Sequence, residues 1–419
     1  MRKVSVAIIG LGARGAGAYA PYVKQFPNEV ELAAVAEPNP ARRELFGEQY
    51  NLAKNVMFES GEDFIKQPKL CDAVIICTWD RMHYEFTMKA LEKGYHVLLE
   101  KPISPDPHEV LHIAQAAKRH QRLLSICHVL RYAKYWESMK KIIDEGKIGN
   151  VVSLQLNENV GYLHHAHSFV RGNWSDAEKS SPMILQKSCH DMDLIRWLVG
   201  SECTRVSSYG SLSYFNEANA PEGATARCTD GCPHEHTCAF SAPRFYLQDL
   251  SLNSFAKHIA DPPTLENRLK ALEEGQYGRC VFRHDNNVVD HQVVNMEFAG
   301  GGTATFSMSA FTRDITRTIL IMGTKGEIRG DFVSGVFQYF EFASQQLTEV
   351  KVNAPIHHHG GGDEGIMRQF LADVRAERTE NLTSADQSVE SHMMAFAAEY
   401  SRLHGGESID MREFAASHL

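Results

Sequence analysis

The sequence lacks the features that mark several large classes of protein. No block rich in Lys or Arg stands out, and the formal net charge is −9, so we expect no nucleic-acid partner. No apolar stretch approaches the ~20 residues needed to cross a bilayer, so we expect no membrane partner. Internal repeats and low-complexity segments are absent from the sequence as well. The hydrophobic share of 43% and the charged share of 23% are ordinary for a globular protein.

We expect no export signal, although the start of the chain superficially resembles one. Met1-Arg2-Lys3 precedes an apolar run, but this run is short and enters a glycine turn without a small-residue cleavage site. We therefore expect a cytoplasmic protein whose cysteines are mostly free and buried. Five of the nine cysteines lie in or beside apolar runs and fit this expectation: Cys71, Cys77, Cys127, Cys189 and Cys280.

The length of 419 residues suits two domains. In residues 1–127, short apolar runs alternate with helical patterns such as Arg81–Lys93 and Pro107–His120. The predicted strands are Val4–Ile9, Glu31–Ala36, Ala73–Cys77, His96–Leu99 and Leu123–Cys127. This alternation predicts an α/β domain with a Rossmann doubly wound parallel sheet, in which ligands bind at the carboxyl ends of the strands.

Residues 128–419 are predicted to form a second, α+β domain for substrate binding and oligomerisation, with a largely antiparallel open sheet. Its helical patterns are Trp136–Glu145, Met183–Leu198, a stretch after Asp363 with Ile366, Phe370 and Val374, and a stretch from Ser384, which forms a capping box with Gln387. Its strand patterns are Val151–Asn157, Val288–Phe298, Thr303–Ser309, Thr316–Met322 and Val336–Phe342. Residues around 215–280 are poorly periodic and indicate a long insertion.

A dinucleotide fingerprint occupies the first forty residues. The apolar run Val4–Ile9 enters the pattern Gly10-Leu11-Gly12-Ala13-Arg14-Gly15, and the next apolar run ends on Glu37. The glycines permit a tight turn that lets the backbone approach a pyrophosphate at the following helix N-terminus. Glu37 lies roughly 20 residues further on, where an acid binds the ribose hydroxyls. A carboxylate there repels a 2′-phosphate, so NAD is favoured over NADP.

Two further motifs indicate hydride transfer. The triplet Glu100-Lys101-Pro102 places a lysine at the carboxyl end of a predicted strand, beside the expected nicotinamide position. Downstream, Lys187-Ser188-Cys189-His190-Asp191-Met192-Asp193 lies in a predicted helix. Lys187 and His190 would share one face of that helix with Leu194 and Trp197.

In this order, the glycine fingerprint, the Glu-Lys-Pro triplet and the His-Asp-x-Asp helix resemble the glucose–fructose oxidoreductase / inositol dehydrogenase (Gfo/Idh/MocA) family. The resemblance implies that Lys101 and His190 lie on the substrate side of the nicotinamide, with His190 accepting the hydroxyl proton and Lys101 stabilising the oxygen. It also implies a cis bond before Pro102. The expected cofactor-binding residues are Gly10, Gly12, Ala13, Arg14, Gly15, Glu37, Thr78, Trp79, His83, Glu100, Lys101 and Arg131.

The sequence departs from the family pattern at two positions. The family often carries an Asp four residues before the helix histidine, and this chain has Gln186 there, followed by Lys187. His190 would then lack its usual orienting partner, and Lys187 would either bind substrate or share the acid–base work. Trp79 stands where relatives usually carry a proline after the threonine, so we expect different cofactor contacts there.

Substrate contacts are expected from residues near the predicted cleft, with a solvated loop as the alternative for the segment 164–174. An arginine in that segment can pair with a carboxylate and a tryptophan can stack on a sugar ring. The expected set is His128, His165, His167, Arg171, Trp174 and Asp191. The histidines His357, His358 and His359 either line the same cleft or lie in a surface loop.

The insertion carries a dense cysteine and histidine cluster. Its candidate metal ligands are Cys228, Cys232, Cys238 and His234. Thiols and imidazoles are the ligands of tetrahedral zinc, so the cluster is either a structural zinc site or a loop with free thiols. A catalytic metal is not expected.

Together these features predict an NAD-dependent oxidoreductase acting on a CH–OH group of a sugar, sugar acid, glycoside or cyclitol. One alternative is a glycosidase or lyase that oxidises the sugar transiently and regenerates NAD. Another is a nucleotide-sensing protein without turnover, which the presence of both Lys101 and His190 disfavours. An open antiparallel sheet commonly packs against a copy of itself, so a homodimer or homotetramer is expected.

Overall fold

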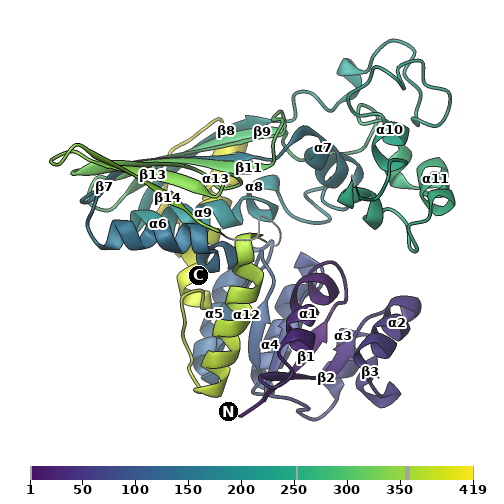
Figure 1. The fold of residues 1–419 in the computed structure, drawn as a ribbon, viewed down its shortest axis with the longest axis horizontal. Coiled ribbons are helices and arrows are strands. Elements are labelled where there is room, and N and C mark those ends of the chain that lie inside the picture. The colour runs from purple at the N-terminus through teal and green to yellow at the C-terminus, as the bar shows by residue number, and fades with distance from the viewer. Residues whose placement is uncertain (1, 252, 354–358, 419) are drawn as a thin grey trace.

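Two β-sheets organise the chain, as shown by a computed structural model that describes residues 2–251, 253–353 and 359–418 (Figure 1). The first sheet has six strands in the order β3-β2-β1-β4-β5-β6, all parallel. The second has nine strands in the order β14-β13-β12-β11-β7-β10-β9-β8-β15. The predicted fold class, a Rossmann sheet followed by an α+β part with a largely antiparallel sheet, is confirmed.

The first sheet has the strand order of a dinucleotide-binding fold, in which the chain reverses direction across the sheet between β1 and β4. The strand bounds are β1 Val4–Ile9, β2 Val30–Ala36, β3 Met57–Phe58, β4 Ala73–Ile76, β5 His96–Leu99 and β6 Leu124–Ile126. Four of these strands are wholly or almost wholly buried, which explains why they read as continuous apolar runs. Apart from the short β3, which the periodicity missed, the predicted strands are confirmed to within a residue at each end.

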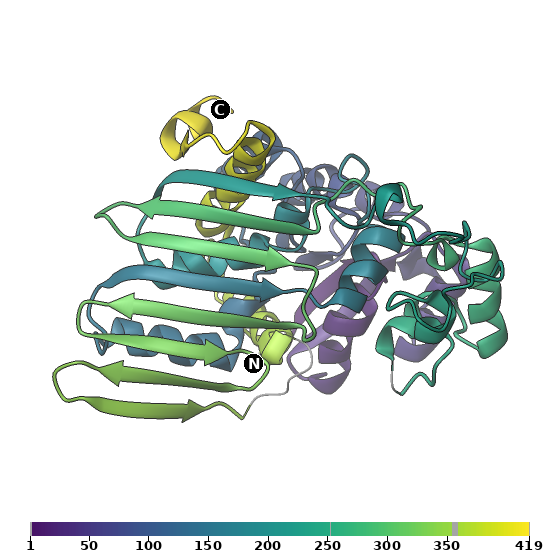
Figure 2. The same cartoon turned by 90° about the horizontal axis from the view of Figure 1, so that it is seen from above.

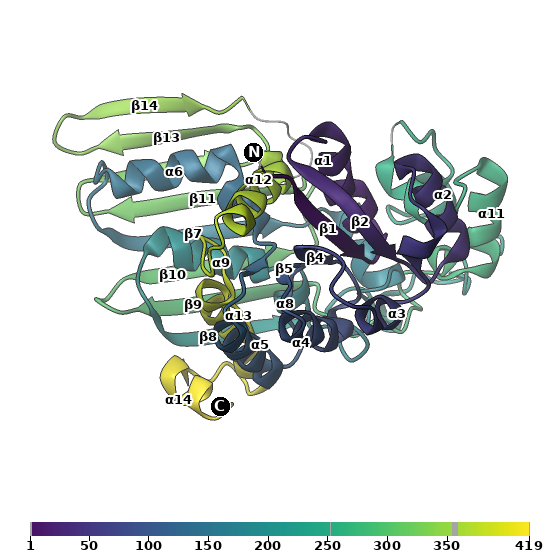
Figure 3. The same ribbon diagram turned by 90° about the horizontal axis from the view of Figure 1, so that it is seen from below.

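Helices cover both faces of this sheet (Figure 3). They are α1 Ala20–Gln25, α2 Pro40–Tyr50, α3 Gly61–Lys66, α4 His83–Glu92 and α5 Pro107–His120. Alternate residues of β1 enter two different apolar clusters, with Ala7 and Ile9 in one and Val6 and Ile8 in the other. This alternation is what a sheet buried on both faces requires.

The second sheet is antiparallel except where β7 and β10 run parallel. Its strands are β7 Val151–Asn159, β8 Cys203–Ser211, β9 His291–Phe298, β10 Thr303–Ser309, β11 Thr316–Gly323, β12 Gly326–Asp331, β13 Val336–Glu341, β14 Gln346–Lys351 and β15 Ile409–Asp410. The sequence predicted β7, β9, β10, β11 and β13 and missed the other four. The helices of the described part of the chain pack on one face of this sheet, and Figure 2 shows the opposite face without a covering helix.

The helices of the second half are α6 Lys134–Asp144, α7 Tyr162–His165, α8 Met183–Gln186, α9 Cys189–Val199, α10 Ala242–Tyr246, α11 Leu265–Glu274, α12 Gly362–Arg375, α13 Ala385–Leu403 and α14 Met411–Ala416. The single helix predicted over Met183–Leu198 is wrong, because the chain breaks between α8 and α9 at Lys187 and Ser188. Ser188 has φ −97° and ψ 6°, and its carbonyl accepts the first backbone bonds of α9. The break removes Lys187 from the face that carries His190.

The predicted capping box at the start of α13 is also wrong. Ser384 precedes the helix, but its hydroxyl donates to the backbone carbonyl of Asn381 at 3.1 Å instead of capping the first turn. The local turn competes for the serine hydroxyl, as it often does at such positions.

The C-terminal helices join the two halves. Ile366, Phe370 and Val374 of α12 lie along one face, as predicted, and they belong to the same apolar cluster as Val6 and Ile8 of the first sheet. Helix α13 contacts α5 of the first half and α9 and β8 of the second. We therefore keep the domain boundary at residue 127 as a proposal. In this division, α12 belongs to the second domain by sequence but packs into the core of the first.

The insertion projects from one end of the second sheet beside α7 and carries α10 and α11 (Figure 1). Two small apolar clusters of its own hold it together, one around Phe215 and Phe240 and the other around Tyr246 and Leu272. Among the helices of the described residues, none is both long and apolar enough to span a lipid bilayer.

Candidate active site at the ends of the parallel strands

The glycine turn after β1 has no space for larger side chains at two positions. Gly10 has φ +92°, and a Cβ there would lie 2.6 Å from the Cys77 carbonyl oxygen. A Cβ on Gly15 would lie 2.0 Å from the Gly10 carbonyl oxygen. A Cβ on Gly12, by contrast, would meet no atom of the described residues within 4 Å. Gly10 and Gly15 are therefore required by the tight backbone packing of the turn. Gly12 and the adjacent Ala13 lie at its surface, where a ligand could approach.

This contrast predicts opposite effects for two alanine substitutions. Gly15→Ala should lower the free energy of unfolding by several kcal/mol, because the turn backbone would have to shift. Gly12→Ala should change it by less than about 0.5 kcal/mol in the absence of nucleotide and should instead weaken NADH binding. Urea unfolding and fluorescence titration with NADH measure the two effects. Equal unfolding free energies for the two variants would contradict this division of roles.

Three more predicted cofactor residues follow β2 and β4, the two strands that flank β1 in the sheet. Glu37, after β2, is 4% exposed, and its carboxylate accepts backbone N–H bonds from Leu11 at 2.8 Å and Asn39 at 3.0 Å. Each carboxylate oxygen keeps a further lone pair for a ribose hydroxyl. After β4, the Thr78 hydroxyl is buried without a hydrogen-bond partner in the described structure. The Trp79 side chain beside it is 54% exposed.

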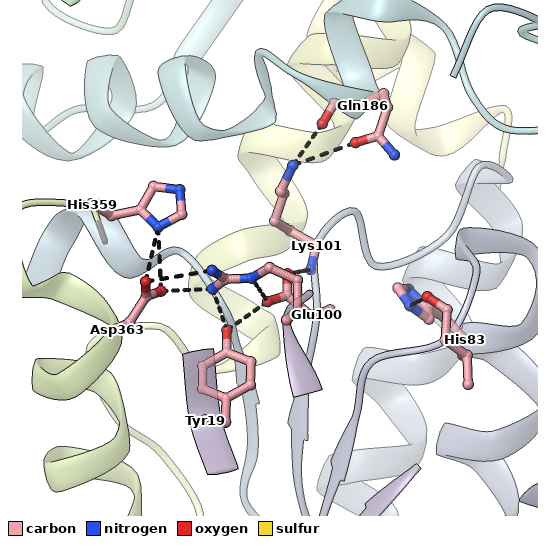
Figure 4. Close-up of polar contacts among 9 residues, drawn as sticks. Tyr19, His83, Glu100, Lys101, Gln186, His359 and Asp363 are labelled. Atoms are coloured by element: carbon pink, nitrogen blue, oxygen red, sulfur yellow. Dashed lines mark hydrogen bonds and ion pairs between the residues drawn. The ribbon is translucent and has the colours of Figure 1, made fainter. Parts of the chain in front are cut away.

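Arg14 of the glycine turn and Glu100 after β5 form an ion pair. Figure 4 shows Glu100 with Tyr19 and Asp363, which share this network. Arg14 Nε lies 2.5 Å from a Glu100 oxygen, and its Nη2 lies 2.6 Å from Asp363 at the start of α12. The Tyr19 hydroxyl donates to Glu100 at 2.5 Å. Burial alone would raise the pKa of Glu100, but Arg14 and Tyr19 lower it below its ordinary value. Both predicted cofactor residues are thus engaged in a buried network that joins β5 to α12.

Lys101 reaches across to the second half of the chain. Its bond to Pro102 is cis, as the resemblance implied. Lys101 Nζ donates to the backbone carbonyl of Gln186 at 2.7 Å, and the side-chain oxygen of Gln186 lies 3.4 Å away (Figure 4). The Gln186 amide donates in turn to the buried carboxylate of Asp80 at 3.1 Å. Gln186, the departure from the family pattern, therefore anchors the lysine amine.

His83 supports the backbone around the lysine. Its Nδ1 lies 2.8 Å from the Pro102 carbonyl and its Nε2 lies 3.2 Å from the Thr78 carbonyl (Figure 4). The ring is 1% exposed. These contacts give His83 a bracing position between two strand ends instead of the cofactor contact that the resemblance suggested.

Four imidazoles surround the start of α9. The ring of His190 lies 5.9 Å from that of His128 and 5.8 Å from that of His359, and His128 lies 5.4 Å from His392. Nδ1 of His190 and both ring nitrogens of His128 are buried without partners in the described structure. Burial, followed by the nearby charge of Lys101, lowers the pKa of His190 well below 6.5. The neutral imidazole of His190 is therefore available as a base.

Arg131, predicted to touch the cofactor, supports this cluster from behind. Its Nε and Nη2 bind the two oxygens of Asp193 at 2.8 and 2.7 Å, and its Nη1 donates to the Leu382 carbonyl at 2.9 Å. The guanidinium is fully engaged and 3% exposed. This bidentate pair links the segment that follows β6 to helix α9. Because these contacts occupy its guanidinium, we do not propose Arg131 as a cofactor-binding residue.

Lys187 and Asp191 belong to a second buried network. Lys187 lies 3.0 Å from Glu158 of β7, and Arg317 of β11 bridges Glu158 at 2.7 Å and Asp191 at 2.6 Å. Burial raises the pKa of Asp191 to about 6 despite Arg317. Asp191 itself is 0% exposed, so the expected direct substrate contact does not fit its position. Lys187, whose side chain is 18% exposed, is the member of this network that reaches the surface.

The segment 164–174 does not present its side chains as expected. His165 stacks on Phe215 and is 0% exposed, while His167 stacks on Tyr277 and its Nδ1 meets the Tyr246 hydroxyl at 3.0 Å. These rings form the base of the insertion because burial and aromatic stacking outweigh solvation of a neutral imidazole. Their expected substrate contacts are therefore corrected to structural ones.

The other two members of this segment are also part of the packing. Arg171 is 1% exposed and donates to the carbonyls of Arg279 at 2.9 Å and Phe240 at 2.8 Å. Trp174 is partly buried against the core of the second sheet. Both side chains are occupied by these contacts within the protein. Of the three histidines at 357–359, His359 forms an ion pair with Asp363. His357 and His358 lie outside the described residues.

The predicted metal ligands of the insertion are not gathered into a coordination shell. Within the described residues, no group of three or more His, Cys, Asp or Glu side chains is placed so that it could hold a metal ion as it stands. His234 Nε2 lies 2.8 Å from the Glu222 carbonyl. All nine cysteines are free.

The site thus brings a nucleotide turn, a lysine amine and a neutral imidazole together from both halves of the chain. Lys101 contacts Gln186, four residues before His190, and its charge acts on the His190 ring. Such a combination defines a nucleotide-dependent oxidoreductase. The sequence missed the residues that support it, among them Tyr19, Asp80, Glu158, Asp193, Arg317 and Asp363.

Family models identify the oxidoreductase more closely. One described as "Oxidoreductase family, NAD-binding Rossmann fold" matches residues 4–128, and one described as "Oxidoreductase family, C-terminal alpha/beta domain" matches residues 140–407. The chain belongs to the Gfo/Idh/MocA oxidoreductase family. The expectation drawn from the sequence motifs is therefore confirmed.

Individual relatives are distant. Putative oxidoreductase YteT of Bacillus subtilis is 23% identical, over 91% of this chain and 92% of YteT. Inositol 2-dehydrogenase 4 of Saccharopolyspora erythraea is 27% identical, over 54% of this chain and 61% of that enzyme. A solved levoglucosan dehydrogenase in complex with NADH and levoglucosan shares the fold, with a TM-score of 0.72, 16% identity and coverage of 98% of this chain and 100% of the other.

Proposed function

We propose that this protein transfers hydride between NAD and a CH–OH/ketone pair on a sugar, sugar acid, glycoside or cyclitol. The observation that carries the proposal is the approach of the Lys101 amine to the α8–α9 junction that bears His190. Relatives that include an inositol 2-dehydrogenase and a levoglucosan dehydrogenase support a polyhydroxylated substrate.

The residues at the strand ends fit a dinucleotide. The Gly10–Gly15 turn leaves the backbone accessible to a pyrophosphate, and open space lies beside Gly12. Glu37 has lone pairs for ribose hydroxyls. After β4, the Thr78 hydroxyl has no hydrogen-bond partner in the described structure, and the Trp79 indole is exposed. When bound there, NAD would supply the hydride acceptor or donor. The carboxylate of Glu37 supports NAD in preference to NADP.

The two central side chains divide the work on the substrate oxygen. In the oxidising direction, the neutral imidazole of His190 takes the hydroxyl proton. Lys101 donates to the same oxygen and stabilises its developing negative charge. The Gln186 carbonyl holds the amine in place, and Asp80 orients Gln186.

The substrate contacts that the structure supports differ from the expected set. Lys187 and His359 retain access to solvent, with side chains 18% and 37% exposed, and the ring of His359 lies 5.8 Å from that of His190. We propose that they bind further hydroxyl groups of the substrate. Lys187 is held in position by its ion pair with Glu158. Arg317 binds both Glu158 and Asp191 and so fixes this carboxylate.

A substrate panel tests the function. Sugars, sugar acids, glycosides and inositols are incubated with the purified protein and NAD or NADP, and reduced cofactor is followed by absorbance. We expect at least one polyol to reduce NAD in a stoichiometric reaction, with NADP less effective. Cleavage of a glycoside without net NADH formation would instead support the redox-neutral alternative and overturn the dehydrogenase.

We also propose that copies of the chain associate through the uncovered face of the second sheet, as a homodimer or a homotetramer. Tyr209 and Val293 pair across β8 and β9 on this face and are 56% and 37% exposed. Exposed apolar side chains on an open sheet are typical of subunit contacts.

A further inference from the structure

Four cysteines of the insertion line one small cavity although they lie far apart in the sequence. Cys228, Cys232 and Cys238 come from one loop, and Cys280 comes from the segment that leads back to β9. Arg171 forms another part of the wall. From its apolar surroundings, Cys280 was expected to be an isolated buried thiol, so its place among the other three is new.

Backbone pairing brings the first and last of these cysteines to the same side. Arg227 and Arg279 form an isolated antiparallel bridge, and the N–H groups of Cys228 and Cys280 each donate to a carbonyl across it, at 2.8 and 2.9 Å. Side chains alternate along paired strands, so Cys228 and Cys280 both point to the face opposite the two arginines. The pairing therefore holds the two thiols on one face before any ligand binds.

A backbone N–H group is directed at one of the sulfurs. The Phe240 amide donates to Cys238 Sγ at 3.4 Å, from two residues further along the chain. Hydrogen bonds from N–H groups stabilise a thiolate more than a thiol. Such donors support metal-bound thiolates.

The buried Arg171 lacks an acidic partner. Its guanidinium is 1% exposed and donates to two backbone carbonyls and, at 3.6 Å, to Cys228 Sγ. Among the described residues, no carboxylate lies within ion-pair distance of it. Burying a cation without a counter-charge is unfavourable, so negative charge is expected in the adjoining cavity.

We propose that Cys228, Cys232, Cys238 and Cys280 bind one structural zinc ion. Four thiolates around Zn²⁺ carry two net negative charges, which the buried guanidinium partly offsets. Three residues separate the first two cysteines, a spacing found in zinc sites. Binding requires the thiols to turn into the cavity and release their protons to solvent, with no change in oxidation state.

Cys280 replaces His234 in this ligand set. Nε2 of His234 is already engaged with the Glu222 carbonyl at 2.8 Å, whereas Cys280 faces the same cavity as the other thiols. The ion would tie the loop at 228–238 to the segment that returns to β9. It would thereby fix both ends of the insertion beside α7.

Metal analysis of the full chain tests the proposal. Protein purified under reducing conditions with zinc present should contain about one zinc per chain by mass spectrometry of metals. Cys280→Ser and Cys232→Ser should lose the zinc, while His234→Ala and the matched control Cys203→Ser, a buried thiol in β8, should keep it. A metal-free wild type, or loss in His234→Ala with retention in Cys280→Ser, would overturn the assignment.

A second measurement avoids dependence on the folding of the variants. Wild-type protein exchanged with Co²⁺ should show the thiolate-to-metal charge-transfer absorption of tetrahedral sulfur ligation. Absence of these bands would contradict the site, as would iron with visible absorbance in the purified protein. Disulfides among these four cysteines in protein isolated with reductant would also overturn it.

Discussion

Replacing Lys101 by Met should lower kcat/KM by about 10²–10³-fold while leaving NADH affinity nearly unchanged. Loss of one donor to a developing oxyanion typically costs this much, because the donor acts mainly in the transition state. Methionine keeps the length and the apolar stem of the side chain but cannot donate to the substrate oxygen. Steady-state kinetics with the substrate found in the panel and fluorescence titration with NADH measure the two quantities.

Two controls separate this role from a structural one. Lys101→Arg should retain more activity than Lys101→Met, since it keeps a cationic donor, although its planar group fits the Gln186 carbonyl less well. Lys89→Met removes a lysine at the surface of α4 and should have no effect. Full activity in Lys101→Met would exclude the amine from the chemistry, and loss of NADH binding would give it a structural role instead.

Replacing His190 by Asn should lower kcat by about 10²–10⁴-fold, the range for removing a positioned acid–base group. The pH dependence of kcat distinguishes this role from misfolding, because misfolding lowers activity without moving the pH at which it declines. Burial and the charge of Lys101 lower the pKa of His190 well below 6.5, so its base form persists as the pH falls through 6.5. Oxidation by the wild type should therefore keep its activity at pH 6.5 and decline only at lower pH.

The matched control for this experiment is His112→Asn on the exposed surface of α5. Within the described residues, the hydrogen-bond partner of His112 is the Tyr84 hydroxyl, so kcat and the pH profile should not change. An acid limb of the wild type above pH 6.5 would mean that His190 is not the titrating base. An active His190→Asn enzyme would transfer the role to another group, with Lys187 the first candidate.

The sequence predicted the first sheet well because its strands are buried on both faces and read as apolar runs. It missed β14, Gln346–Lys351, because this edge strand is largely exposed and polar. It missed β8, Cys203–Ser211, for a related reason, since polar residues and a glycine fill most of the positions around Val206. Helix periodicity similarly concealed the break at Lys187 and Ser188, where apolar residues continue on both sides.

Local motifs identified the catalytic candidates, whereas long-range contacts decided which of the other polar residues are available. Lys101 and His190 stand out from short patterns at strand and helix ends. Arg171 looked equally functional in its segment, but its partners Arg279 and Phe240 lie about 108 and 69 residues away in the chain. For Cys280 the long-range contacts act in the opposite way and bring an apparently isolated residue into a candidate site. The pairing of Arg227 with Arg279 places it beside the other thiols.

The position of α12 bears on how the molecule is made. The parallel sheet is encoded before residue 127, yet Ile366, Phe370 and Val374 complete the apolar layer on one of its faces. A growing polypeptide would leave that layer open until α12, Gly362–Arg375, has been synthesised. Final consolidation of the nucleotide-binding half therefore depends on a helix that leaves the ribosome long after the strands that it covers.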